Sequence, residues 1–122
     1  MSNTKANIDL IIDKVDDILN KKGYSNTDYA IGRICKDWGG RFEPTTSVKI
    51  TIDKSFFNNS DIDKLVEDTI IPFSKAINSK VWKDHDKNKS TILINFRNKN
   101  ILSIEELKLS FKSYDGINKF KL

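Results

Sequence analysis

The hydrophobic residues of this chain recur with two different periods, and that change of period most constrains the fold. Apolar residues in residues 8–22 follow helical spacing, and Gly23 comes directly after them as a C-terminal stop. Residues 47–53 instead alternate strictly between apolar and polar, as expected of a strand with one buried face. The sequence therefore predicts both helices and strands within one short chain.

A second helix is predicted to begin at Ser60. Ser60 is a good N-cap, and Asp63 follows three residues later, as in a capping box. Pro72 lacks a backbone donor and is expected to kink or divide this helix. The predicted inner face consists of Ile62, Leu65, Val66, Thr69, Ile70, Phe73 and Ile77.

The remaining segments carry weaker patterns. Residues 91–97 and 107–113 alternate with a period of two and are predicted as strands, although Ser103 and Glu106 would also suit the start of a short helix. Residues 27–38 fit a helix that ends at the Gly39-Gly40 pair. Residues 24–46 as a whole stay open between helix, strand and loop.

These elements predict a two-layer α+β fold, with a small, mostly antiparallel or mixed sheet and helices packed on one face. A length of 122 residues lies within the usual range for one core, so we expect a single domain over residues 1–122. Residues 46–113 would form its core, and residues 1–40 a helical N-terminal extension.

The composition bears on the cellular location of the protein and on membrane association. No apolar run approaches the ~20 residues that cross a bilayer, and the N-terminus lacks the pattern of a signal peptide. Cys35 is the single cysteine, which excludes an internal disulfide and a cysteine-based zinc cluster. We therefore expect a cytoplasmic protein with no membrane partner.

The formal net charge of +4 suits an anionic partner such as nucleic acid. If the predicted strands share a sheet, its outward residues include Lys49, Arg97, Lys108 and Lys112. A basic open face of this kind could approach a phosphate backbone, but solvated lysines on an exposed strand are equally ordinary.

Two acidic pairs are the main hint of chemistry. Asp61 and Asp63 stand at the predicted helix start, and Asp84 and Asp86 flank His85 in VWKDHDK. Mg²⁺ needs carboxylate oxygens that converge. The helix climbs ~1.5 Å per residue, and an extended return of ~3.3–3.6 Å per residue could just bring Asp84 back to the first pair. Helix capping explains Asp61 and Asp63 without a metal.

The order of these pieces resembles the RusA-type Holliday junction resolvases. The resemblance covers about residues 46–113: strand SVKITI, then DIDKLV opening a helix, then VWKD, then TILINF and LKLSF. Asp61 and Asp63 match the paired metal-binding acids of that family, and Lys64 the residue after them. Trp82, Lys83 and Asp84 match the approach to its third acid. Glu67 and His85 depart from the family pattern, which has a basic residue and a second Asp there.

This resemblance implies a homodimeric, Mg²⁺-dependent endonuclease of phage or prophage origin that cuts branched DNA. Its site would use Asp61, Asp63, Asp84 and Lys64 for catalysis. The metal would be held by Asp61, Asp63 and Asp84 or Asp86. DNA would contact Lys49, Lys64, Lys83 and Arg97.

Other readings of the same residues stay open. His85 could be a base, a metal ligand or simply an exposed residue in a polar turn. The chain could also be a small inhibitor or toxin-immunity protein, whose acidic first helix meets a basic partner. A third possibility is a DNA-binding domain that has the fold without the activity.

Overall fold

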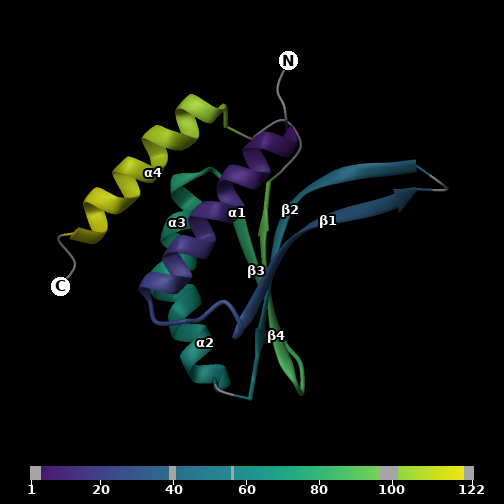
Figure 1. Ribbon diagram of the computed structural model, residues 1–122, viewed down its shortest axis with the longest axis vertical. Coiled ribbons are helices and arrows are strands. Elements are labelled where there is room, and N and C mark those ends of the chain that lie inside the picture. The colour runs from purple at the N-terminus through teal and green to yellow at the C-terminus, as the bar shows by residue number, and fades with distance from the viewer. Residues whose placement is uncertain (1–3, 39–40, 56, 97–101, 120–122) are drawn as a thin grey trace.

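The helices all lie on one side of a four-stranded sheet (Figure 1). The computed structural model describes residues 4–38, 41–55, 57–96 and 102–119. In chain order the elements are α1 (Thr4–Lys21), β1 (Tyr29–Trp38), β2 (Arg41–Asp53), α2 (Asn59–Leu65), the π-helical turn η1 (Val66–Ile70), α3 (Ile71–Ala76), β3 (Lys80–His85), β4 (Lys89–Asn95) and α4 (Ile104–Lys119). The strands are ordered β1-β2-β4-β3 and pair antiparallel throughout. The predicted two-layer α+β fold is confirmed.

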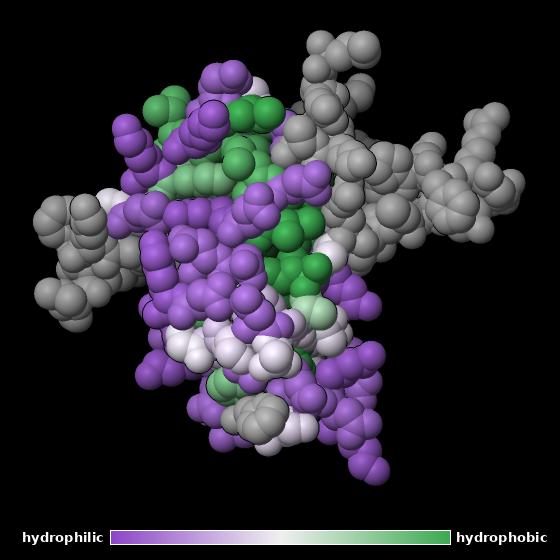
Figure 2. Space-filling view, in the orientation of Figure 1, coloured by the Kyte–Doolittle hydropathy of each residue, from purple (hydrophilic) through white to green (hydrophobic). Residues whose placement is uncertain are grey.

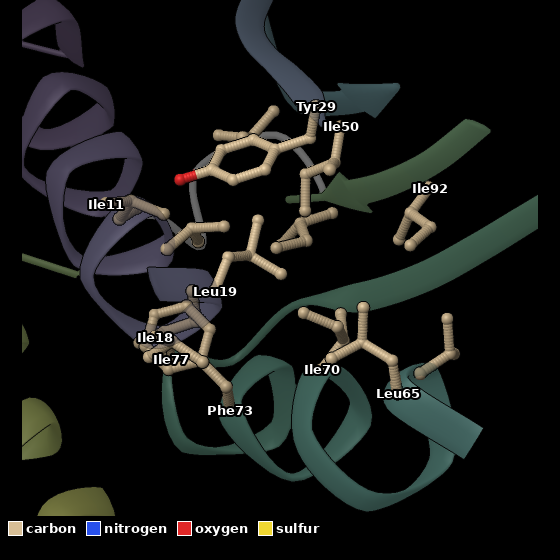
Figure 3. Close-up of a cluster of buried hydrophobic side chains, with 14 of the residues drawn as sticks. Ile11, Ile18, Leu19, Tyr29, Ile50, Leu65, Ile70, Phe73, Ile77 and Ile92 are labelled. Atoms are coloured by element: carbon tan, nitrogen blue, oxygen red, sulfur yellow. The ribbon is translucent and has the colours of Figure 1, made fainter. Parts of the chain in front are cut away.

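The core lies between the inner face of the sheet and the helices (Figure 3). On β2 and β4, Ile50 pairs with Ile92 and Val48 with Ile94, and all four side chains are buried. Every residue predicted for the inner face of the second helix is also buried. The period-two and helical patterns therefore identified the buried residues of β2, β4, α1 and the second helix correctly.

The favoured helix over residues 27–38 is wrong, because this segment forms β1. Tyr29 lies opposite Ile52 and Ile31 opposite Ile50, and the pairing continues to Trp38 and Arg41. β2 is longer than the predicted strand over residues 47–53, and β1 pairs with most of that length, with a register shift between Arg33 and Cys35.

The predicted strand over residues 107–113 is also wrong, because this segment belongs to α4. The hydroxyl of Ser103 accepts a hydrogen bond from the backbone N–H of Glu106 at 3.2 Å, which caps the helix. Leu107 and Tyr114 are buried seven residues apart, whereas Leu109 is 68% exposed. The spacing of the buried residues is therefore helical.

The N-cap of the second helix lies two residues earlier than the predicted N-cap, Ser60. Asn58 is the N-cap: its side-chain oxygen accepts from the backbone N–H of Asp61 at 2.8 Å, and the Asp61 carboxylate accepts from the backbone N–H of Asn58. The helix continues as η1 and α3, with Pro72 at the start of α3. The helix is therefore divided close to Pro72, as expected. The π-helical turn η1 directly before α3 accommodates the backbone N–H that Pro72 lacks.

None of the helices in the described ranges has the length and apolarity needed to cross a membrane. Arg97, which was predicted to contact DNA, belongs to residues 97–101 and lies outside the described residues.

The two candidate caps of this helix can be separated by mutation. We expect Asn58→Ala to lower the free energy of unfolding by ~1 kcal/mol, because the orphan backbone donors of the first turn lose their acceptor. Ser60→Ala serves as the matched control and should change stability by less than ~0.5 kcal/mol, as surface substitutions usually do. Urea denaturation measures both, and an equal loss in the two variants would contradict the observed cap.

Candidate functional site

The acidic start of α2 divides its two aspartates between different tasks. Asp61 is held in the capping box with Asn58. Asp63 lies one half-turn further along and points to β3, where its Oδ1 atom binds the ammonium of Lys83 and lies 2.7 Å from Nε2 of His85. The start of α2 is thereby tied to the edge strand of the sheet.

The alternation of β3 decides which of its side chains can meet Asp63. Lys83 pairs with Ile92 and His85 with Ser90, and both partners are buried on the inner face. Trp82 pairs with Leu93 and Asp84 with Thr91, so Trp82 and Asp84 lie on the face that no described helix covers. Successive side chains of a strand point to opposite faces. Asp84 therefore points away from Asp63.

Asp63, Lys83, His85 and Ser90 form one hydrogen-bonded cluster, which we call the Asp63 cluster. The hydrogen bond from Lys83, followed by that from His85, lowers the pKa of the Asp63 carboxyl below its ordinary value of 3.8. A carboxylate accepts only, so Nε2 of His85 donates to Asp63. Nδ1 of His85 lies 2.6 Å from the hydroxyl of Ser90, which completes the chain of contacts.

The Asp63 cluster contains the residue types of a serine hydrolase, but its geometry is structural. Ser90 is 0% exposed, so its hydroxyl cannot reach a substrate. A nucleophile must be accessible to the group it attacks. What the cluster does instead is satisfy the buried hydroxyl of Ser90 and hold α2 against β3, since buried polar groups need partners.

The predicted magnesium ligands are not brought together among the residues that the structure describes. Asp61 caps α2, Asp63 binds two basic side chains, and Asp84 lies on the opposite face of β3. The carboxylate of Asp86 accepts a hydrogen bond from the backbone N–H of Lys87 in the β3–β4 turn. Within the described ranges, no three His, Cys, Asp or Glu side chains form a group that could hold a metal ion. Mg²⁺ binding therefore stays a prediction.

The open face of the sheet carries a largely exposed aromatic side chain. Trp82 is 71% exposed. It belongs to a row that crosses all four strands: Gly32, Lys49, Leu93 and Trp82. Lys49 and Lys80 are exposed on the same face as Trp82. The face therefore offers one large aromatic surface beside two ammonium groups.

Charge is divided between the two layers. The helical elements contain eight lysines and eleven acidic residues, whereas the strands contain seven basic and four acidic residues. The helix side of the molecule is largely hydrophilic, with hydrophobic groups where α4 approaches α1 (Figure 2). The net charge is therefore positive in the strands and negative in the helical elements.

The predicted basic residues lie in different places. Lys49 is on the open face, Lys83 is in the Asp63 cluster, and Lys64 is exposed on α2. Lys108 and Lys112, expected on the sheet, are on α4 instead.

The family resemblance identifies Trp82 only as a residue that precedes the third acid, Asp84. The alternation of VWKDHD could have placed it on a strand, with Lys83 and His85 on the other face.

Comparison with protein-family models, with curated proteins and with solved structures finds no match to this chain. The resemblance to the RusA-type resolvases therefore stays a prediction from short motifs.

The Asp63 cluster predicts a particular dependence of stability on pH. A carboxyl whose pKa is lowered by folding stabilises the protein above its ordinary pKa of 3.8, and this contribution disappears as the pH falls through the lower folded-state value. We expect Asp63→Asn to reduce the urea midpoint at pH 7, and the difference from wild type to shrink in acid. Asp84→Asn is the matched control, because Asp84 has no ion-pair partner among the described residues. A difference between wild type and Asp63→Asn that persists unchanged in acid would contradict this assignment.

Proposed function

We propose that this chain binds nucleic acid through the open face of its sheet. The observation that carries the proposal is Trp82, 71% exposed on the basic layer of a molecule whose acidic residues are concentrated in its helices. Nucleic acid is a polyanion with stackable bases, so it matches both properties of this face.

Each part of the face has a chemical task in this proposal. The indole of Trp82 stacks on a base, a contact that contributes ~1–3 kcal/mol by alanine substitution. The ammonium groups of Lys49 and Lys80 neutralise phosphates and release counterions. Lysine and an aromatic ring on a flat sheet read no particular base sequence, so we expect weak sequence preference.

The placement of the acids favours binding over cleavage. Metal-assisted hydrolysis needs carboxylates that share a cation beside the phosphate. Here Lys83 and His85 bind the Asp63 carboxylate, and Asp84 lies on the open face of the sheet, away from Asp63. A phosphate on the open face would meet Asp84 as a repelling charge rather than through a metal ion.

The alternative of an acidic inhibitor or immunity protein is less well supported by the contacts of α1. Asp17 lies 3.2 Å from Lys21 and 3.8 Å from Lys14, and Lys14 also binds Asp115 on α4. These pairs within the chain neutralise part of the acidic face that would meet a basic partner.

Substitution of Trp82 tests the proposed surface directly. We expect Trp82→Ala to weaken DNA binding about tenfold, which corresponds to ~1.4 kcal/mol and lies within the range for loss of one stacked base. Leu109→Ala is the matched control, because Leu109 is the other large exposed hydrophobic side chain and lies on α4. Fluorescence anisotropy with a labelled oligonucleotide measures both affinities. Equal affinity of the two variants would contradict the proposal.

A synthetic four-way junction separates binding from cleavage. We expect no cut product with or without Mg²⁺, for wild type and for Asp63→Asn, because the described acids share no cation site. Gel electrophoresis of the labelled junction gives the result. Cleavage that needs Mg²⁺ and is lost in Asp63→Asn would instead restore the nuclease prediction.

A further inference from the structure

A hollow rich in lysine lies at one end of the open face. The start of β1, the end of β2 with the residues after it, and the β3–β4 turn line this hollow together. Its basic residues are Lys54, Lys87 and Lys89, and we call it the lysine hollow. Thr51 and Ala30, which pair on the open face, also line it, so the hollow is continuous with the surface that carries Trp82.

Three lysines and two aspartates, Asp28 and Asp53, line the hollow, so its formal charge is positive, and Asp53 lies opposite Lys89. One carboxylate oxygen of Asp53 accepts hydrogen bonds from the backbone N–H and the hydroxyl of Ser55, at 2.8 and 2.7 Å. Asp28 accepts from the backbone N–H of Ser25 at 2.8 Å. Neither Lys87 nor Lys89 has an ion-pair partner among the described residues. Their ammonium groups are therefore free to bind phosphate.

The register gives the separation between the hollow and Trp82. Trp82 lies opposite Leu93, and Lys89 lies four residues before Leu93 on β4, which is ~13 Å at the rise of a β-strand. Thr51 and Thr91 occupy the row between them. Asp84 also lies in that row, at the sheet edge, and repels phosphate toward the two threonines. This span is about that of four stacked bases at ~3.4 Å, and of fewer bases in an extended strand.

We propose that the ligand is a single-stranded nucleic acid that stacks one base on Trp82 and places its backbone phosphates in the lysine hollow. This proposal rests on the function proposed above and names its substrate class. A ring that lies exposed on a sheet face needs a base with a free face, which single strands provide along their length and duplexes provide only at their ends. Both contacts lie on one face, so one short strand can reach both.

The test compares labelled single-stranded DNA, single-stranded RNA and duplex DNA, each of about 16 nucleotides or base pairs, the upper end of site sizes for a small β-sheet module. Affinity is measured by anisotropy between about 50 and about 200 mM salt. We expect wild type to bind a single strand at least tenfold more tightly than the duplex. The DNA and RNA arms show whether the 2′-hydroxyl contributes.

The lysine hollow is tested by the double variant Lys87→Gln with Lys89→Gln. For single strands, log affinity falls with log salt by ~0.7 per phosphate contact, so the slope should become shallower by ~1.4 in this variant. The matched control is Lys75→Gln with Lys108→Gln, which removes the same charge from exposed positions on α3 and α4. The control should keep the wild-type slope.

The outcomes separate the two proposals. Wild type that binds none of the three ligands contradicts the proposed function, and this inference with it. Duplex binding as tight as single-strand binding, or equal slopes in the two double variants, overturns this inference alone. Preference for the single strand together with a shallower slope only in the hollow variant supports it.

Discussion

Burial of the inner residues of β2 and β4 beneath the helices is the interaction on which the rest of the structure depends. Val48, Ile50 and Ile52 on β2 lie opposite Ile94, Ile92 and Ser90 on β4, and each of these side chains is buried. A slip of either strand by one residue would turn the buried residues of that strand to the open face. Each buried isoleucine contributes about 1.5–3 kcal/mol, whereas an exposed ion pair contributes about 0–1 kcal/mol. Apolar burial therefore sets the register of the strands, and the register in turn determines which face of the sheet each polar residue lies on.

The same register determines what the polar residues of β3 can do. Because β3 pairs with β4, Lys83 lies beside Ile92 and His85 beside Ser90, on the helix side, where Asp63 meets them. Trp82 and Asp84 must then face the other way. In this way the burial of β4 both assembles the Asp63 cluster and separates Asp84 from Asp63.

Local pattern predicted the fold best where a segment's own residues decide its structure. α1, β2, β4 and the second helix each bury the residues that their periodicity indicates. β1 was misassigned because Ala30, Ile31 and Ile34 also fit a helix, and its strand structure comes from pairing with β2. Two glycines between apolar runs are typical of a hairpin as well as of a helix stop.

The sequence of α4 is compatible with both the period of a strand and the period of a helix. Leu107 and Phe111 fit both an alternation with Leu109 and a helical stripe with Ile104 and Tyr114. The cap made by Ser103 and Glu106 decides for the helix, because it supplies partners for the first-turn donors. The candidate site was harder to predict for a related reason. Whether Asp63 meets a carboxylate or a lysine depends on which residues of β3 face the helices, and β3 begins seventeen residues later in the chain.

The exposed indole of Trp82 is not explained by protection of the sheet edge. An exposed edge strand is a liability for edge-to-edge pairing, and β3 is guarded by charged residues at positions 80, 83 and 84. A large aromatic side chain on such a strand works against that protection. Its burial adds little to stability because it is 71% exposed, and for this reason the proposed function assigns it a contact with another molecule. In that proposal, the lysines on the same face favour an anionic ligand, and the flat π surface favours a ligand with aromatic rings of its own.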